Sequence, residues 1–211
     1  KRMATAIARM SETNLPIIYL NMVGGQDEIV FDGNSFALNV GGELVSHLPS
    51  FSETVSLVNV TSKLSEVRLI GQIHKPEEGV ASCYSALMVG IRDYVEKNNF
   101  PGVALGLSGG IDSALVAVLA ADALGAEKVS AIMMPSEFTA DISLNDAKSL
   151  ADNLGINYKT IAIGGAMSQM DDMLEPYFKE TQTGIAEENI QSRLRGLTLM
   201  AYSNKFGPMV L

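Results

Sequence analysis

The hydrophobic pattern of the chain changes near residue 80, and after that point it alternates between strand-like and helical spacing. Apolar residues recur about every three to four positions over residues 80–95, which predicts an amphipathic helix ending at Asn98-Asn99. Short apolar runs predict strands at residues 103–107, 129–134 and 159–163. Helical stripes predict further helices over residues 114–124, 143–155, 167–178 and 186–205. Strands separated by helices of about ten to fifteen residues predict βαβ units and a parallel sheet.

Before residue 80 the pattern consists of short extended segments broken by glycines. The predicted elements are a helix end over residues 1–10, a buried strand over 15–21, and extended segments over 28–39 and 54–60. We expect Gly24-Gly25 to interrupt the strands and Gly41-Gly42 to form the turn of a hairpin over residues 35–48. The apolar pattern weakens over residues 61–79, and residues 75–79 are polar and helix-breaking. We therefore predict two domains, residues 1–72 and 81–211, joined by a linker that ends near residue 80.

The composition fits a globular protein of one to two domains: 211 residues, of which 47% are hydrophobic and 18% charged. Its formal net charge of −9 argues against a nucleic-acid partner or an acidic membrane surface. The charge is uneven, with a net of −1 in residues 1–75 and −8 in residues 76–211. A single cysteine, Cys83, excludes an internal disulfide. With no apolar run long enough for a bilayer and no signal pattern after Lys1, the sequence predicts a cytoplasmic protein.

The stretch that carries chemistry is Gly106-Leu107-Ser108-Gly109-Gly110-Ile111-Asp112-Ser113. It lies between a predicted strand and a helix that we expect to start near Ala114, where open α/β sheets bind ligands. The glycines let backbone N–H groups approach an anion, while Ser108 and Ser113 add hydroxyl donors and the helix N-terminus adds its positive dipole end. The stretch therefore predicts a phosphate cradle. Because Asp112 would repel bound phosphates, we expect a magnesium ion between its carboxylate and the phosphates.

Three kinds of functional site are considered for residues 106–113. A Walker A loop is excluded because it requires a lysine that is missing here. The nucleophile elbow of serine hydrolases fits residues 106–110, but its histidine should follow Ser108. His47 and His74 both precede it, so this hydrolase would need a histidine beyond Leu211. The Ser-Gly-Gly-x-Asp-Ser signature of PP-loop ATP pyrophosphatases matches at every fixed position. A glycine-rich turn without a ligand leaves both serines and the aspartate unexplained.

Several segments, taken in order, resemble the synthetase domain of the glutamine-dependent NAD(+) synthetase family: residues 86–87, 90–94, 106–113, 134–136, 187–196 and 200–205. The Glu-Asn-Ile-Gln-x-Arg-x-Arg segment within 187–196 is far more specific than the PP-loop, which occurs throughout its superfamily. Residues 1–62 resemble the C-terminal part of a nitrilase-like glutaminase domain, through residues 21–28 and 31–36. A glutaminase domain ahead of a PP-loop domain is the arrangement of the glutamine-dependent form.

The resemblance implies an α/β fold class: the C-terminal piece of a nitrilase-like α/β sandwich, followed by an incomplete PP-loop ATP pyrophosphatase domain with a parallel sheet. It also implies a two-step reaction. ATP adenylates the nicotinate carboxylate of deamido-NAD and releases pyrophosphate, and ammonia derived from glutamine then displaces AMP to give NAD. The implied cofactors are ATP and Mg²⁺, and the implied partners are these small molecules and other copies of the chain. We expect no nucleic-acid or membrane partner.

The resemblance also assigns roles to residues. The implied ATP-binding residues are Gly106, Leu107, Ser108, Gly109, Gly110, Ile111, Asp112, Ser113, Met134 and Arg193. Asp112 is expected to hold the metal and Asn189 to contact deamido-NAD. Asn189 and Arg193 lie four residues apart, hence on one helix face, whereas Ile190, Leu194 and Leu197 are expected to face the core. The resemblance places Arg193 and Arg195 near the nucleotide. Their alternative role is to pair with surface carboxylates such as Glu187 or Glu188.

The catalytic triad of the family's glutaminase, Glu-Lys-Cys, belongs to sequence before Lys1, so no catalytic residue is assigned in this chain. We expect Cys83 to be a buried core residue of its helix instead of that nucleophile. His47 and His74 lie apart in a hairpin and a linker, which gives no metal-ligand cluster. We expect neither active site to be complete within these 211 residues and the chain by itself to be inactive.

Overall fold

The structure, a computed structural model, describes residues 1–63, 66–179, 181–182 and 184–211. Its contacts divide the chain into two compact units, Lys1–Tyr94 and Val95–Leu211. The division falls inside helix α2 (Gly79–Lys97), later than the expected linker, because the first part of this helix packs against strands of the first unit. The domain boundary at residues 72–80 stays a prediction.

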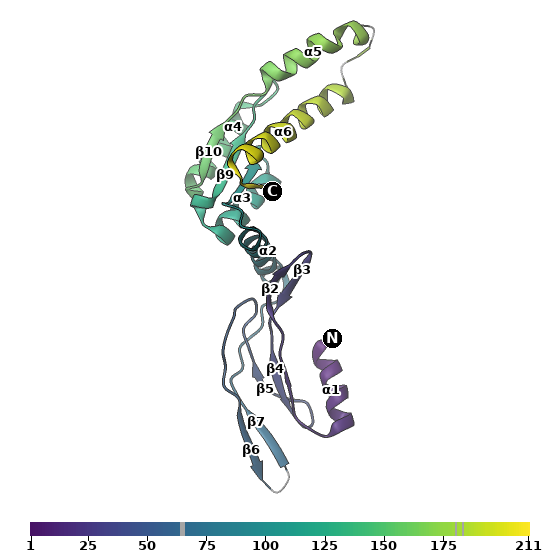
Figure 1. The fold of residues 1–211 in the computed structure, drawn as a ribbon, viewed down its shortest axis with the longest axis vertical. Helices are drawn as coiled ribbons and strands as arrows, with labels where there is room; N and C mark the ends of the chain where they lie inside the picture. Colours follow the sequence, from purple (N-terminus) through teal and green to yellow (C-terminus); the bar gives the residue numbers. More distant parts are fainter. Residues whose placement is uncertain (64–65, 180, 183) are drawn as a thin grey trace. The chain divides into compact units, whose positions relative to one another are not determined.

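The first unit is built from antiparallel strands, helix α1 (Arg2–Thr13) and the first part of α2 (Figure 1). A three-stranded sheet has the order β1-β4-β5, formed by β1 (Ile17–Tyr19), β4 (Phe36–Asn39) and β5 (Glu43–His47). Two further antiparallel pairs are β2 (Val23–Gln26) with β3 (Ile29–Asp32) and β6 (Asn59–Lys63) with β7 (Glu66–Ile70). Helix α1 places Ala6 and Met10 on Phe36 and Leu38 of β4, so the helix and the sheet share one small core.

Several predictions for the first unit need correction. Gly24-Gly25 does not interrupt the strands but lies inside β2. Glycine is required there because Gly25 passes close to α2: its N–H donates to the Asp93 carboxylate at 2.8 Å, and a Cβ would lie 3.3 Å from that of Asp93. The strand expected to be buried over residues 15–21 is shorter and half-exposed, with Ile18 facing outward. The hairpin over residues 35–48 is confirmed.

The pair β6–β7 lies largely in the stretch where the apolar pattern weakens, over residues 61–79. All described residues of β6 are exposed, so no alternating apolar face marks it in the sequence. The extended segment expected at residues 54–60 enters this strand only at Asn59. Strand pairing without a buried face therefore escapes a prediction based on hydrophobic periodicity.

The second unit contains a four-stranded parallel sheet with the order β10-β9-β8-β11 (Figure 1). Its strands are β8 (Val103–Gly106), β9 (Val129–Met133), β10 (Asn157–Thr160) and β11 (Met209–Val210). Its elements between the strands are α3 (Ile111–Leu124), the 3-10 turn η1 (Ala126–Lys128), α4 (Asp141–Leu154), α5 (Gly164–Phe178) and α6 (Ile185–Phe206). The predicted parallel sheet is confirmed. Strands β8 and β9 are apolar on both faces and almost fully buried, as expected for a sheet covered by helices.

Helices α3, α4 and α5 begin two or three residues earlier than their apolar patterns suggest. Helix α3 starts at Ile111 instead of near Ala114, because Gly110 is its N-cap and Ile111 is 81% exposed and outside the apolar stripe. Helix α4 starts at Asp141, two residues before the predicted start at residue 143, so Ser143 lies inside the first turn instead of capping the helix. The earlier start of α3 places Asp112 and Ser113 in its first turn.

Two residues expected in the core are exposed. Cys83 is exposed on α2, whose buried residues are Val89 and Val95, so its predicted core role is wrong. Leu197 of α6 is 65% exposed, because the inward side of this helix is formed by Ile190, Leu194 and Leu199 with their neighbours.

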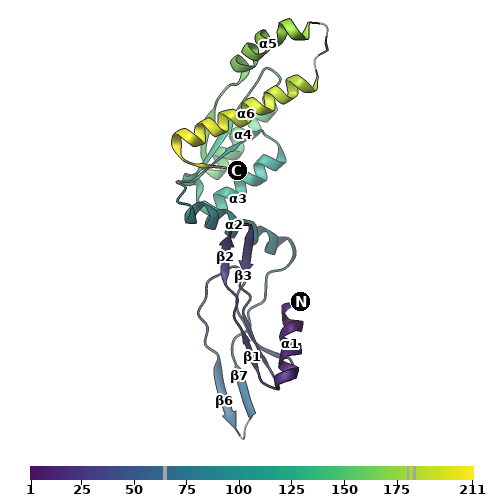
Figure 2. The same ribbon diagram turned by 45° about the vertical axis from the view of Figure 1, so that its right-hand side comes forward.

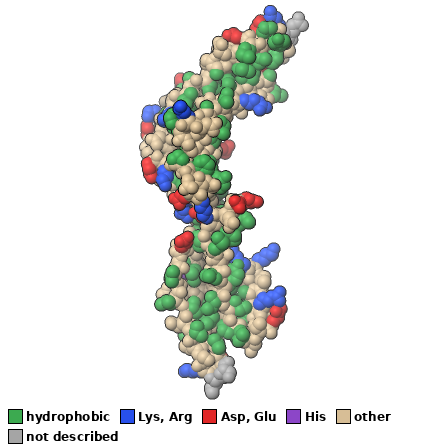
Figure 3. All heavy atoms as spheres, in the orientation of Figure 1, with side chains coloured by type: hydrophobic (Ala, Val, Ile, Leu, Met, Phe, Trp, Pro, Cys, Tyr) green, Lys and Arg blue, Asp and Glu red, His purple; other side chains and the backbone are tan. Residues whose placement is uncertain are grey.

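Exposed apolar side chains gather on α5 and α6, which lie next to each other in Figures 1 and 2: Met173, Tyr177, Ile185, Leu197 and Met200. On the face drawn in Figure 3, hydrophobic side chains gather near the α5 end and also over the first unit, and acidic and basic side chains are scattered over both units. In the part of the chain that the structure describes, no helix combines the length and apolarity needed to cross a bilayer.

Candidate functional site

The carboxyl end of β8 is the point in the second unit where the strand order reverses. Strand β8 pairs with β9 on one side and with β11 on the other. Open α/β sheets bind ligands in the crevice outside such a reversal. A cavity of about 540 Å³ lies there, lined by Gly106, Leu107, Ser108, Ile132, Met133, Met134, Ser136, Phe138, Thr139, Ala140, Ser143, Gln191, Arg195, Leu199 and Leu211.

The turn from β8 into α3 requires glycine at residue 109. Gly109 has a φ of +79°, in the left-handed region, and a Cβ there would lie 2.5 Å from the Ser143 carbonyl oxygen. This close approach brings the turn against the first turn of α4. The backbone N–H groups at the start of α3 are left without helical partners, so they are available to an anion.

Two serine hydroxyls hold the turn in shape. The Ser113 hydroxyl donates to the Gly110 carbonyl at 3.1 Å and accepts the Ser108 N–H at 3.2 Å. With its proton used in this way, Ser113 Oγ accepts from Ser108 Oγ at 2.9 Å. Ser108 Oγ in turn accepts the Gly110 N–H at 3.3 Å. The predicted cradle residues are therefore brought together, and the cradle is preformed by its own hydroxyls.

Asp112 is exposed in the first turn of α3 and does not line the cavity. A carboxylate at this position is favoured by the helix dipole. Magnesium is usually held by one or two carboxylates together with substrate phosphates, and an exposed carboxylate beside the predicted phosphate cradle fits that requirement. Over the described residues there is no group of three or more His, Cys, Asp and Glu side chains that would hold a metal unaided.

Helix α6 forms the opposite wall of the cavity. Gln191, Arg195 and Leu199 line it at intervals of four residues, which is one face of a helix. The Gln191 Nε2 donates to Ser136 Oγ at 2.6 Å, and the Arg195 Nε donates to the Met134 carbonyl at 3.4 Å. The helix is therefore tied to the segment that follows β9.

The predicted residues are only partly assembled at this cavity. Met134 is buried there and Arg195 lines it, as expected for residues near a nucleotide. Asn189 and Arg193 are exposed on α6 and do not line it. Their assigned roles stay predictions. Glu187, considered as an ion-pair partner of the arginines, instead accepts the Gly184 N–H at 2.7 Å, and this backbone hydrogen bond holds the pKa of its carboxyl below the usual range.

Sequence reasoning missed four polar residues of the cavity: Ser136, Thr139, Ser143 and Gln191. Gln191 had a usable signal, because residues 191, 195 and 199 have the spacing of a single helix face next to a predicted strand end. Ser136 also had a signal, because it lies in the segment 134–136 that resembles the family. Thr139 and Ser143 had none, because they lie in the turn after β9 and in the first turn of α4, whose positions depend on the fold.

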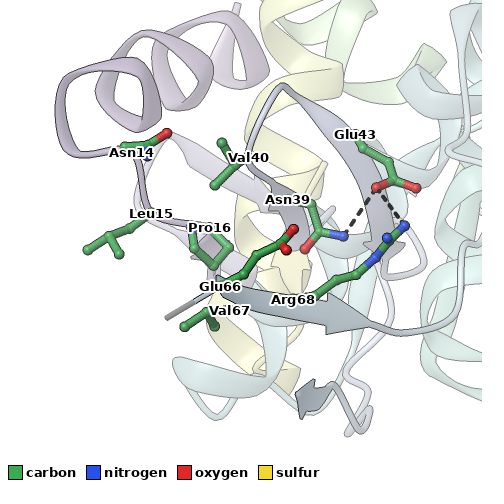
Figure 4. Close-up of a pocket in the computed structure, with 9 residues that line it drawn as sticks. All are labelled: Asn14, Leu15, Pro16, Asn39, Val40, Glu43, Glu66, Val67 and Arg68. Atoms are coloured by element: carbon green, nitrogen blue, oxygen red, sulfur yellow. Dashed lines mark hydrogen bonds and ion pairs between the residues drawn. The ribbon is translucent and has the colours of Figure 1, made fainter. Parts of the chain in front are cut away.

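A cavity of about 430 Å³ in the first unit is built differently (Figure 4). Its polar groups bind one another: Glu43 Oε2 accepts from the Asn39 amide at 3.2 Å and from Arg68 at 3.4 Å. These contacts join β4, β5 and β7. The polar lining of this cavity therefore serves the fold of the first unit.

Comparison with known proteins gives a consistent result. The family model described as NAD synthase matches residues 83–211. The glutamine-dependent NAD(+) synthetase of Rhodobacter capsulatus is 48% identical over 205 residues, which cover 97% of this chain and 37% of that protein. The corresponding protein of Acinetobacter baylyi is 40% identical over 210 residues, covering 100% of this chain and 39% of that protein.

Solved structures agree with the sequence relatives. The glutamine-dependent NAD+ synthetase of Acinetobacter baumannii, in complex with ADP, superposes with a TM-score of 0.90 at 40% identity, over 99% of this chain and 39% of that one. The NH3-dependent NAD synthetase of Campylobacter jejuni, in complex with nitrate, gives a TM-score of 0.57 at 32% identity, over 64% of this chain and 56% of that one. The chain spans about two fifths of the length of the curated relatives it matches. It belongs to the NAD synthase family.

Proposed function

We propose that the protein carrying this chain converts deamido-NAD to NAD in an ATP-dependent amidation, with AMP and pyrophosphate as by-products and glutamine as the source of ammonia. The observation that carries the proposal is the preformed glycine–serine cradle at the strand-order reversal, with a cavity beside it. The names of the relatives and the ADP bound to the Acinetobacter baumannii protein support an adenine nucleotide in that cavity.

The chemistry explains why a nucleotide cradle belongs to an amidating enzyme. A carboxylate resists attack by ammonia, since an oxide ion would have to leave. When a carboxylate oxygen of deamido-NAD attacks the α-phosphorus of ATP, pyrophosphate departs and AMP becomes a usable leaving group. Ammonia then attacks the carbonyl carbon, loses a proton and displaces AMP. The protein's contribution to the first step is positioning and neutralisation of charge.

In this proposal the cradle of Ser108, Gly109 and Gly110 holds the pyrophosphate part of ATP, and the start of α3 adds its dipole. Asp112 holds Mg²⁺ together with the phosphates, and the ion supplies charge neutralisation. Met134, at the end of β9, lies against the adenine. Arg193 as an ATP ligand and Asn189 as a deamido-NAD ligand rest on the family motif alone.

The test incubates the intact protein with deamido-NAD and Mg-ATP, supplies either glutamine or ammonium, and measures NAD and AMP. NAD from both nitrogen donors supports the whole proposal. NAD from ammonium alone retains the synthetase and removes the glutamine step. Formation of ADP in place of AMP would contradict adenylation.

A variant test concentrates on Asp112. We expect Asp112→Asn to lower kcat at least about a hundredfold while ATP binding largely persists, because one charge at the phosphates is lost. Asp146→Asn, which changes an exposed carboxylate on α4, is the matched control and should leave kcat unchanged. Equal effects of the two substitutions would argue against a metal at Asp112.

Two alternatives remain testable. Another PP-loop enzyme would release AMP but ignore deamido-NAD. A serine hydrolase would use Ser108, yet the Ser108 hydroxyl bonds to Ser113 and residues 95–211 contain no histidine. Labelling of Ser108 by a fluorophosphonate would favour the hydrolase, whereas tight Mg-ATP binding without labelling would exclude it.

The remaining proposals concern the cellular setting. A cytoplasmic location fits a chain of 211 residues with one cysteine. A homo-oligomer is proposed from the family resemblance, and sedimentation of the intact protein tests it.

A further inference from the structure

The contact between Gln191 and Ser136 is a short link between distant parts of the second unit. The Gln191 Nε2 donates to Ser136 Oγ at 2.6 Å, across 55 positions of sequence. One helical turn further along α6, Arg195 donates to the carbonyl of Met134. The two donors are spaced by four residues on the helix and meet positions 134 and 136 of the segment after β9.

Ser136 is also the organising residue of a tight turn. Its hydroxyl accepts the Phe138 N–H at 3.4 Å, its N–H donates to Thr139 Oγ1 at 2.9 Å, and its carbonyl accepts the Thr139 N–H at 3.1 Å. These bonds close the turn on itself but do not fix it to the rest of the unit. The bond from Gln191 to the Ser136 hydroxyl supplies a link to α6.

This turn separates two cavities. Phe138 and Gln191 line both the 540 Å³ cavity beside the cradle and a cavity of about 810 Å³ between α5 and α6. On its other side the same segment leads into α4, where the Ser143 carbonyl lies against Gly109 of the cradle. The turn therefore forms a wall of the cavity and is continuous with the support of the cradle.

We propose that Gln191 is a positioning residue for the nucleotide: its hydrogen bond to Ser136 holds the turn over residues 136–139 as the wall of the cavity, next to the phosphate cradle. The inference rests on the proposed function for the identity of the ligand. Without this bond the wall is free to move toward the larger cavity. Ordering the wall then lowers the net free energy gained when ATP binds. Gln191 influences ATP binding only indirectly, by holding this turn in place.

The test compares Gln191→Met, which keeps the length of the side chain and removes its amide, with Ser136→Ala and the double variant, all in the intact protein. We expect KM for ATP and the calorimetric Kd for ATP to rise about fivefold in Gln191→Met, the worth of one neutral hydrogen bond. The rise should be at least as large in Ser136→Ala, which also removes the acceptor of the Phe138 N–H. The double variant should match Ser136→Ala alone, because the second change then has no bond left to remove. We expect kcat and KM for deamido-NAD to stay within about twofold of wild type.

Ser192→Ala, at an exposed neighbour on α6, is the control and should leave every constant unchanged. An ATP affinity of Gln191→Met within twofold of wild type, or a double variant whose effect is the product of the singles, would overturn the inference. A lower melting temperature with unchanged ATP affinity would also overturn it, because that result describes a merely structural contact. If the wild-type protein makes no NAD, the proposed function fails, and the calorimetric comparison still decides the role of Gln191.

Discussion

The two compact units use their polar side chains differently. The buried polar side chains Ser35, Asn39, Ser46, His47 and Ser50 all belong to the first unit, whereas the buried side chains described in the second unit are apolar. The second unit uses a regular parallel ladder, and the polar side chains at its cavity bond to one another and to the backbone of the turns that line it. Short strands in the first unit use their polar side chains as substitutes for backbone partners.

Asn39 shows this substitution most clearly. Its amide donates to the Leu69 carbonyl at 3.1 Å, and its side-chain oxygen accepts the Leu69 N–H at 2.8 Å. One side chain therefore pairs β4 with β7 as a neighbouring strand would. His47 makes a similar contact through Nδ1 to the His74 carbonyl at 3.1 Å. The comparison teaches that polarity marks packing in one unit and a candidate site in the other.

The largest effect should come from Gly109→Ala in the second unit. A Cβ there meets the Ser143 carbonyl at a positive φ, so we expect about 3 kcal/mol of destabilisation and at least about a hundredfold weaker ATP binding. Calorimetry and denaturant unfolding measure the two effects. Gly196→Ala on α6, where no atom lies within 4 Å of a new Cβ, is the control and should stabilise by about 0.5 kcal/mol. Equal tolerance at both sites would show that the turn is not held in this conformation.

Asn39→Ala should produce the next largest effect, in the first unit. It leaves the N–H and carbonyl of Leu69 buried without their side-chain partner, which costs about 2–4 kcal/mol. Urea unfolding should show a lower midpoint with an unchanged slope. A loss below about 0.5 kcal/mol would mean that the polar side chains of this unit do not replace strand partners.

Ser46→Ala also removes a buried polar group of the first unit, but here we expect the stability to increase. Among the described residues, Ser46 Oγ is buried without a hydrogen-bond partner, and alanine keeps its Cβ. Removing the hydroxyl should therefore stabilise the unit by about 1 kcal/mol. The same urea titration measures it, and a destabilisation would indicate a partner that the structure does not include.

The smallest effect should be the pH dependence of the Arg2–Asp32 pair, whose charged atoms lie 2.6 Å apart. Burial raises the pKa of Asp32, but hydrogen bonds from Arg2 and Asn34 together outweigh it, and the net pKa lies below the ordinary value of 3.8. A lowered pKa in the folded state adds stability above that value and loses it as the pH falls through the folded pKa.

Because the Arg2 side chain is 43% exposed, the contribution is a few tenths of a kcal/mol. Unfolding of wild type and Asp32→Asn, measured from pH 6 down to about pH 2.5, should give a difference that shrinks below pH 3.8. A difference that grows on acidification would contradict the sign. Added salt should reduce it at neutral pH.

The sequence predicted the second unit better than the first. Continuous apolar strands and helical stripes mark a parallel sheet directly, and the glycine–serine stretch matched the observed cradle. The start of α3 was predicted three residues too late because Ile111 is exposed. The wall of the cavity was not predicted because Ser136 and Gln191 meet only in the folded unit. Contacts between side chains far apart in sequence leave no local pattern.

Hydrophobic periodicity predicted the first unit poorly for a physical reason. Gly24-Gly25 suggests a break in a strand, and only the nearby Asp93 of α2 explains why a strand needs glycine there. Strand β6 has no apolar face, so pairing with β7 defines it. The sequence also failed to predict that Cys83 is exposed, because its place in an apolar helical stripe predicted burial.

The parallel pairing of Met209 with Val103 has a consequence for the speed of folding. About a hundred residues separate these partners, whereas the antiparallel pairs of the first unit close through short loops. Contacts between distant residues are slow to form, because the loop entropy is lost before the contact stabilises the chain. Refolding should therefore organise the hairpins first and complete the sheet at β11 last, so that the cavity beside β8 is among the final features to form.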